Sequence, residues 1–173
     1  PPTEPVVGYV QGEYVWSTAF GEIVAHQSDI LEVTPHQYMT DYQHAQLVDV
    51  RPTGEYNRFT LPNSVNLPNS LLLANMEQLG HNADMVLLHC AGRTRSIIGA
   101  HTLKAAGYRG NFGIFRGGTQ AWELDGFTRE HGASRTMSAN NESTESVAKF
   151  LNRWQIPSTY IQPTELCKMI EAN

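Results

Sequence analysis

The segment around Cys90 carries the residue types best suited to chemistry. In "LLHCAGRTRSIIGA", residues 87–100, an apolar run ends at a cysteine, and a glycine, two arginines and two hydroxyl side chains follow before a helix-like stretch. A tight loop that enters a helix turns several backbone N–H groups inward and forms a nest for an anion. Such a nest stabilises a thiolate, the reactive form of cysteine, and also offers a pocket to an oxyanion.

These residues predict that Cys90 is a nucleophile and that the residues after it bind substrate. Gly92 allows the loop to turn, and Ser96 is expected to cap the following helix. The competing interpretation is a buried structural cysteine followed by a solvated, arginine-rich loop. Two arginines at a helix start favour the interpretation of Cys90 as a nucleophile. The expected binding residues are Ala91, Gly92, Arg93, Thr94, Arg95 and Ser96.

The elements that must position this loop alternate regularly. Apolar segments typical of strands occupy 46–51, 64–67, 84–89 and 113–118, and segments typical of helices occupy 34–42, 70–79, 95–107 and 117–126. This alternation predicts βαβ units and a parallel sheet covered by helices on both faces. The run "MVLLH" would then deliver Cys90 to the carboxyl edge of the sheet, where α/β proteins keep their ligand crevices.

The regions outside this rhythm suggest how the chain is organised. We predict a flanking segment over 1–33, a domain over 34–128, a polar linker over 129–146 and a C-terminal helix within 147–173. The flanking segment contains a helix-like stretch, "STAFGEIVAHQ". The C-terminal "IQPTELCKMI" echoes "VTPHQYMTDY", which we interpret as the start of a further copy of the domain; chance likeness of two short proline-capped helices is the alternative.

Composition excludes several classes of protein. The formal net charge of −5 argues against a protein that binds nucleic-acid backbone. No apolar run approaches the length of about 18 residues that a membrane helix needs. The chain begins at Pro1, and no signal peptide is recognisable. Two cysteines cannot form a disulfide framework or a cysteine-based zinc site, and the histidines are scattered, so we expect reduced thiols, a cytoplasmic location, no metal and no cofactor.

Three motifs together resemble the rhodanese (sulfurtransferase) domain. "LVDVRPTGEYNRFTLPNSVNLP", "LLHCAGRTRS" and "FRGGTQAWELDGF" are similar to that family's first segment, active-site loop and closing segment, in the same order between Thr34 and Phe127. The resemblance implies a rhodanese-like α/β fold with a mainly parallel, five-stranded sheet and helices on both faces. Together with "TAFGEIVAHQ", it is nearest to chains that carry several rhodanese domains in tandem, which would then be partners of this one.

The resemblance also implies a mechanism. Cys90 would take the outer sulfur of a small anionic donor such as thiosulfate and pass it, as a persulfide, to cyanide or a cellular thiol. The N–H groups of 91–96 would hold the persulfide, and Arg93 and Arg95 would attract the donor and the leaving sulfite. Two departures stand out: many members have glycine where Arg93 lies, and the histidine usual before the Ile-Pro-Gly-Ala motif is Thr60 here.

Two other functions remain open from the sequence. Cys-dependent phosphatases and arsenate reductases have a His-Cys-x5-Arg pattern, whereas here Arg95 follows Cys90 after four residues and Ser96 stands at the arginine position. The shorter loop suits one sulfur atom better than a phosphoryl group with three oxygens. The third class is a non-catalytic binding module, but such members of the family usually lack the cysteine.

Neighbouring residues are predicted to have structural roles. His89 is adjacent to Cys90 on a strand and should point to the opposite face of the sheet. Asp49 and Arg51 are expected to form an ion pair that holds a loop. Trp122 is expected in the core, and Cys167 is expected to be a structural thiol.

Overall fold

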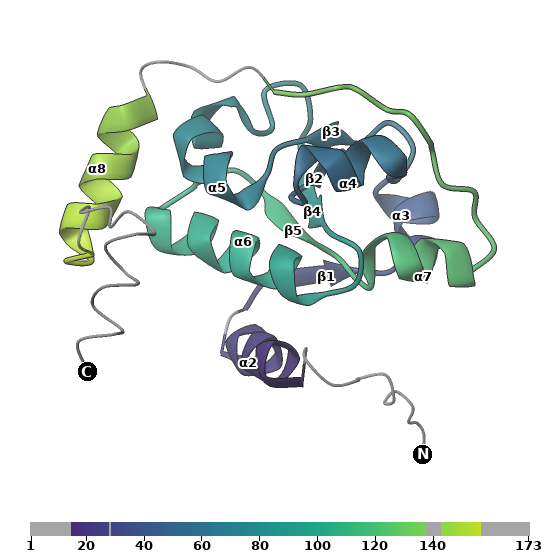
Figure 1. Ribbon diagram of the computed structural model, residues 1–173, viewed down its shortest axis with the longest axis horizontal. Coiled ribbons are helices and arrows are strands. Elements are labelled where there is room, and N and C mark those ends of the chain that lie inside the picture. Colours follow the sequence, from purple (N-terminus) through teal and green to yellow (C-terminus); the bar gives the residue numbers. More distant parts are fainter. Residues whose placement is uncertain (1–14, 28, 138–142, 157–173) are drawn as a thin grey trace, which may run out of the picture.

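The computed structural model describes residues 15–27, 29–137 and 143–156, and its core is a five-stranded sheet (Figure 1). The strands lie in the order β1-β5-β4-β2-β3, and every pairing in this sheet is parallel. Their bounds are β1 Leu31–Val33, β2 Gln46–Asp49, β3 Val65–Asn66, β4 Val86–His89 and β5 Phe112–Phe115. The predicted α/β fold is therefore confirmed.

Helices cover both faces of the sheet. The remaining elements of the domain are α3 Pro35–Asp41, α4 Thr53–Arg58, α5 Asn69–Leu72, the 3-10 helix η2 Leu73–Gln78, α6 Thr94–Ala106 and α7 Gly118–Leu124. Because side chains alternate along a strand, β4 sends Leu88 into the core cluster shared with α5 and α6. It sends Leu87 into the second cluster, where Trp122 of α7 is buried as predicted.

Local signals explain two of the helix ends, the start of α3 and the end of α6. Thr34 caps α3: its hydroxyl accepts from the backbone N–H of Gln37, whose side chain in turn accepts from the N–H of Thr34. At the C-terminal end of α6, Gly107 adopts the left-handed conformation, with φ of 85°, that terminates many helices.

The start of α5 has no side-chain cap. Pro68 occupies the cap position, and no side-chain hydrogen bond caps the helix. The amide of Asn69 instead donates to the backbone carbonyl of Arg95, at 2.9 Å. The side chain of Asn69 thus contacts α6 instead of capping its own helix.

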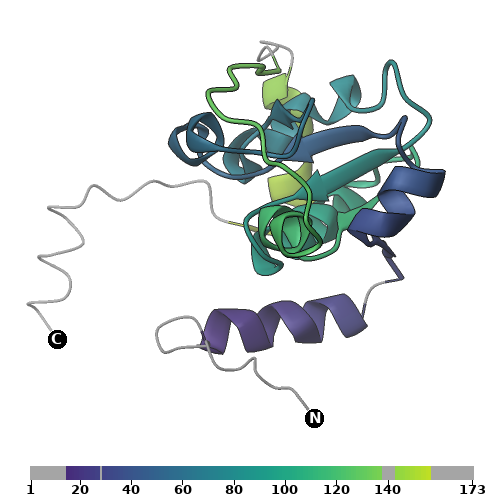
Figure 2. The same ribbon diagram turned by 90° about the vertical axis from the view of Figure 1, so that its right-hand side faces the viewer.

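The described part of the flanking segment, residues 15–27 and 29–33, packs against the predicted domain. β1 pairs with β5, so the sheet begins three residues before the predicted boundary at residue 34. The helix α2, Val15–His26, packs against α6, and Figure 2 shows it on the outer side of that layer. Gly21 allows this approach, because a Cβ there would lie 3.0 Å from the side chain of Thr94.

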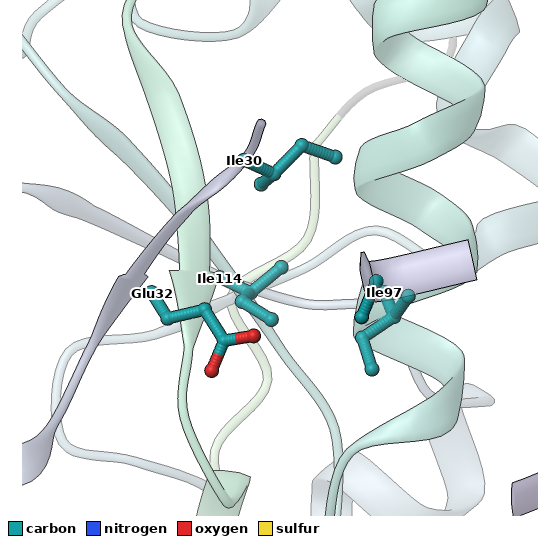
Figure 3. A pocket seen from close by; sticks show the side chains of 5 residues that line it. Ile30, Glu32, Ile97 and Ile114 are labelled. Atoms are coloured by element: carbon teal, nitrogen blue, oxygen red, sulfur yellow. The ribbon is translucent and has the colours of Figure 1, made fainter. Parts of the chain in front are cut away.

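A small pocket lies where α2, β1 and α6 meet (Figure 3). Its lining consists of Ala25, Ile30, Glu32, Ile97 and Ile114. Within this lining only Glu32 is polar, and its carboxylate accepts hydrogen bonds from Arg93. The pocket therefore offers apolar walls and no uncommitted charge.

Within the segment predicted as a polar linker, 129–146, the described residues up to 137 make backbone contacts with the domain. Backbone bonds run both ways between Thr60 and Glu130, at 2.8 and 2.9 Å, and Asn66 donates to the carbonyl of Arg135. These contacts fasten the chain through residue 137 along β3, because pairing to a sheet edge satisfies backbone groups that composition cannot reveal.

The C-terminal helix begins earlier than predicted. It is α8, Ser143–Arg153, and it packs against η2. The second copy of the internal repeat, 161–170, and Cys167 lie outside the described residues. No helix in the described ranges is both long and apolar enough to cross a membrane.

Candidate active site

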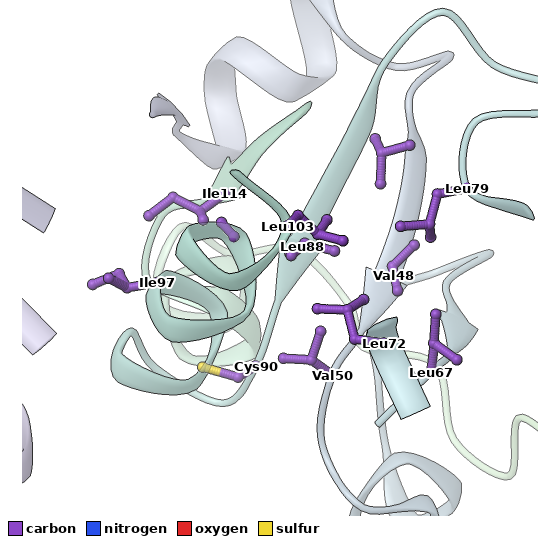
Figure 4. Packing of buried hydrophobic residues seen from close by; sticks show 12 residues of the cluster. Val48, Val50, Leu67, Leu72, Leu79, Leu88, Cys90, Ile97, Leu103 and Ile114 are labelled. Atoms are coloured by element: carbon purple, nitrogen blue, oxygen red, sulfur yellow. The ribbon is translucent and has the colours of Figure 1, made fainter. Parts of the chain in front are cut away.

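Cys90 follows the last residue of β4, at the carboxyl edge of the sheet, as predicted. Its side chain is 2% exposed, and Figure 4 shows it at one end of the core cluster, beside the loop that leads into α6. The loop is shorter than expected, because α6 begins at Thr94 rather than at Ser96. Ser96 does not cap the helix: it lies in the first turn, donates to the carbonyl of Arg93 and places its Oγ 3.7 Å from the Sγ of Cys90.

The loop backbone is polarised by α7. The carbonyl of Cys90 accepts from the N–H of Thr119, at 3.0 Å, and the carbonyl of Ala91 accepts from Gln120, at 2.9 Å. By contrast, no described residue accepts a hydrogen bond from the backbone N–H groups of residues 91–96. These donors lie in the loop after Cys90 and in the first turn of α6, where the helix dipole is positive.

Gly92 fits the loop for a reason other than a left-handed backbone. A Cβ at this position would lie 3.2 Å from the Oε1 of Gln120, which is tighter than an ordinary van der Waals contact. The glycine therefore allows α7 to approach the loop closely.

Arg93 is committed to two carboxylates. Its guanidinium donates to Glu22 of α2, at 2.5 and 3.3 Å, and to Glu32 of β1, at 2.8 Å twice. The hydrogen bonds to Glu32 and then to Glu22 raise the pKa of Arg93 above its usual range, although burial acts against them. Arg93 therefore connects the loop to α2 and β1 of the flanking segment.

Arg95 pairs with a carboxylate on the other side of the loop. Its two terminal nitrogens donate to the two oxygens of Glu55 in α4, at 2.7 and 2.9 Å. The hydrogen bond from Arg95 holds the pKa of Glu55 below its usual value. Glu55 also lies 4.0 Å from Arg51, which forms the predicted ion pair with Asp49, at 2.7 Å and fully buried. Alternating charges therefore run from the core to the rim of the site.

Comparison with known proteins identifies the family. A model of the rhodanese-like domain matches residues 34–125. The chain belongs to the rhodanese-like domain family.

Solved structures show how far the likeness of this rhodanese-like chain extends. Thiosulfate sulfurtransferase from Pseudomonas aeruginosa is 26% identical, with a TM-score of 0.71 over 90% of this chain but 31% of that protein. This chain therefore spans less than a third of that enzyme. A comparison with curated proteins gave no match.

Two more distant structures share the fold alone. A rhodanese-related protein from Thermoplasma volcanium is 23% identical, with a TM-score of 0.51 over 57% of this chain and 96% of that one. A protein of unknown function from Rhodopseudomonas palustris, described as a possible tyrosine phosphatase, is 20% identical, with a TM-score of 0.53 over 75% of this chain and 98% of that one.

The sequence missed the acidic residues of this rhodanese-like site. Residues 90–96 lie together in one loop and one helical turn, but the partners Glu22, Glu32 and Glu55 were not anticipated. Glu55 follows Arg51 by four residues, a spacing that brings side chains together on a helix and could have signalled an ion pair. Glu22 and Glu32 gave no such signal, because their contacts depend on how α2 and β1 pack.

His89 supports the rhodanese-like loop from the opposite side of the strand. It is fully buried, and its Nε2 lies 2.6 Å from the Oγ of Ser64. Its Nδ1 is 4.0 Å from the carboxylate of Asp49. Burial lowers the pKa of His89 to about 4, so the ring is neutral at pH 7. Thr60, at the family's histidine position, donates to Asp49 at 2.8 Å and completes the same buried network.

The neutral state of His89 predicts a pH-dependent stability. The unfolded chain binds the proton with the ordinary pKa near 6.5, whereas the folded chain binds it near 4. Unfolding therefore takes up a proton in this window, and the free energy of unfolding should fall by about 1.5 kcal/mol as the pH drops from 6.5 to 5. Urea unfolding at several pH values measures it.

The matched variant for this prediction is His89→Gln, whose amide nitrogen can still reach Ser64. It should lack the pH slope between 6.5 and 5. The carboxylates with lowered pKa, Asp49 and Glu55, lose their contribution only at more acidic pH. Equal slopes in the two proteins would show that His89 is not the group responsible.

Within the described part of the chain, no three His, Cys, Asp or Glu side chains gather in a way that could hold a metal ion. The described site contains a thiol, backbone N–H donors and paired arginines.

Proposed function

We propose that this chain is a sulfurtransferase that moves a sulfane sulfur from a small anionic donor such as thiosulfate to a thiophilic acceptor such as cyanide or a cellular thiol. The observation that carries the proposal is a buried cysteine at the carboxyl end of β4, followed by six backbone N–H groups that no described residue engages. The similarity to thiosulfate sulfurtransferase from Pseudomonas aeruginosa supports it.

The reaction has two steps that share one covalent intermediate. In the first, the Cys90 thiolate attacks the outer sulfur of thiosulfate; a new S–S bond forms, the bond to the central sulfur breaks, and sulfite leaves with the bonding electron pair. In the second, cyanide attacks the outer sulfur of the persulfide, takes it as thiocyanate and returns the Cys90 thiolate. Atoms and charge balance in both steps, and no oxidant or reductant is consumed.

The loop residues have distinct proposed roles. The N–H groups of 91–96 hold the negative charge of the persulfide, because they are oriented donors at a helix start. Arg95 attracts the oxyanion end of the donor and the leaving sulfite. Arg93 shapes the loop, since its hydrogen bonds go to Glu22 and Glu32.

The setting of the reaction follows from this chemistry. We propose a cytoplasmic location, where thiol acceptors stay reduced. The partners are small sulfur donors and acceptors and, in a longer chain, other rhodanese-like domains; no cofactor, nucleic acid or membrane takes part.

The decisive experiment combines an assay with mass spectrometry. The protein is incubated with thiosulfate and cyanide, thiocyanate is measured, and intact mass after thiosulfate alone should show one added sulfur atom per chain. The short loop predicts little hydrolysis of a generic aryl phosphate, because only three residues separate Cys90 from the start of α6. If the protein hydrolyses the aryl phosphate faster than it consumes thiosulfate, phosphatase chemistry replaces this proposal.

A further inference from the structure

Carboxylates compensate the arginines at the rim of the site, where Arg116 also lies 3.8 Å from Glu32. Two guanidinium groups, those of Arg93 and Arg95, hydrogen-bond to three carboxylates, those of Glu22, Glu32 and Glu55. The sequence alone suggested a strongly positive site. In the structure, carboxylates already pair with the positive charges of these arginines when no donor is bound. This matters most for a donor with two negative charges.

The two arginines differ in what they can still bind. A guanidinium has five N–H donors. The hydrogen bonds of Arg93 to its two carboxylates number four, so almost none of its donors remains. Arg95 makes two, both to Glu55, and its side chain is 42% exposed. Arg95 is therefore the loop cation that can meet a donor, and Glu55 is the carboxylate that opposes it.

Glu55 is fixed in this opposing position from two sides. Arg95 holds both of its oxygens, and the buried Arg51 lies 4.0 Å from one of them. Arg51 cannot follow Glu55 outward, because it forms a buried ion pair with Asp49. Both guanidinium groups therefore favour this position of the Glu55 carboxylate beside Arg95.

We propose that Glu55 is a specificity-determining residue that weakens the binding of dianionic sulfur donors relative to monoanionic donors with the same sulfane sulfur. The inference rests on the proposed sulfurtransferase function. Repulsion between the Glu55 carboxylate and a donor grows with the donor's charge. Removing the carboxylate charge therefore helps a dianion more than a monoanion, whereas loss of a merely structural contact would affect both equally.

The test compares two donors of different charge. Thiosulfate is a dianion, and methanethiosulfonate is a monoanion that gives Cys90 the same sulfur and releases methanesulfinate with the bonding pair. In Glu55→Gln, the ratio of kcat/KM for thiosulfate to that for methanethiosulfonate should rise about three- to fivefold, mainly through a lower KM for thiosulfate. The rise should shrink at high salt, because ions screen a partly exposed site.

The matched control is Glu77→Gln, which changes the formal charge equally at the other edge of the sheet. Glu77 is exposed and lies three residues before Gly80. The N–H of Gly80 donates to the side chain of Gln46, which begins β2, so this segment lies at the amino edge of the sheet. The donor ratio of Glu77→Gln should equal that of the unaltered protein. Glu55→Ala, which removes the same charge without an amide, should shift the ratio in the same direction as Glu55→Gln.

The outcomes separate this inference from the proposed function. An unchanged ratio, or an equal loss with both donors, would overturn the role of Glu55 while leaving sulfur transfer intact. If the unaltered protein accepts sulfur from neither donor, the proposed function itself fails.

Discussion

Replacing Cys90 with serine is expected to lower thiocyanate formation by at least about a thousandfold. Serine keeps the volume of the side chain, but its hydroxyl stays protonated at neutral pH without a general base. The neighbouring groups do not supply one: His89 is neutral but faces the opposite side of the strand, where its Nε2 lies 2.6 Å from Ser64. The measurement is the initial rate with thiosulfate and cyanide.

The control for this prediction is Cys167→Ser, which removes the other thiol of the chain. It should retain nearly full activity, and its intact mass should still rise by one sulfur after thiosulfate. Cys90→Ser should gain no sulfur and should unfold at nearly the same urea concentration as the unaltered protein. Substantial turnover in Cys90→Ser, or a sulfur adduct on it, would show that Cys90 is not the sulfur carrier.

The sequence could predict the layered fold because its signals are local and repeated. Central strands such as β4 are short apolar runs, and some helix ends carry a local signal, such as Thr34 before α3 and Gly107 after α6. In a parallel sheet all carboxyl ends share one edge, so the position of Cys90 after β4 follows from chain order alone.

The electrostatics of the site could not be predicted in the same way. Arg93 lies 71 residues from Glu22 and 61 from Glu32 along the chain, so their contacts exist only once α2 and β1 have packed. Two arginines in the sequence therefore suggested a more positive site than the structure has. The segment after residue 128 was misjudged for a related reason: its polar composition resembles a linker, but its backbone pairs with Thr60 and Asn66.

Replacing Gly118 with alanine is expected to damage the active-site loop without touching a side chain in it. Gly118 has φ of 54°, and a Cβ there would lie 2.1 Å from the carbonyl oxygen of Cys90. That contact is with backbone and cannot be relieved by a rotamer change. The start of α7 must therefore move away, and the hydrogen bonds from Thr119 and Gln120 that orient the loop carbonyls will weaken.

We expect Gly118→Ala to lower kcat/KM for thiosulfate by about a hundredfold, since small displacements of reacting groups cost that much. The free energy of unfolding should fall by about 3 kcal/mol, because the clash adds to the strain of an alanine at positive φ. Thiocyanate assays and urea unfolding provide the two measurements.

Gly126→Ala is the matched control, because Gly126 ends the same helix with φ of 86° but has no atom within 4 Å of the added Cβ. Its free energy of unfolding should fall only by the backbone strain, about 1 kcal/mol, and it should keep its sulfur-transfer rate. If the two alanine variants lose equal stability and both remain active, the approach of α7 to Cys90 does not shape the loop. If Gly118→Ala alone loses activity while still folded at the assay temperature, the orientation of the loop carbonyls by α7 is what keeps the N–H groups of 91–96 available to the persulfide.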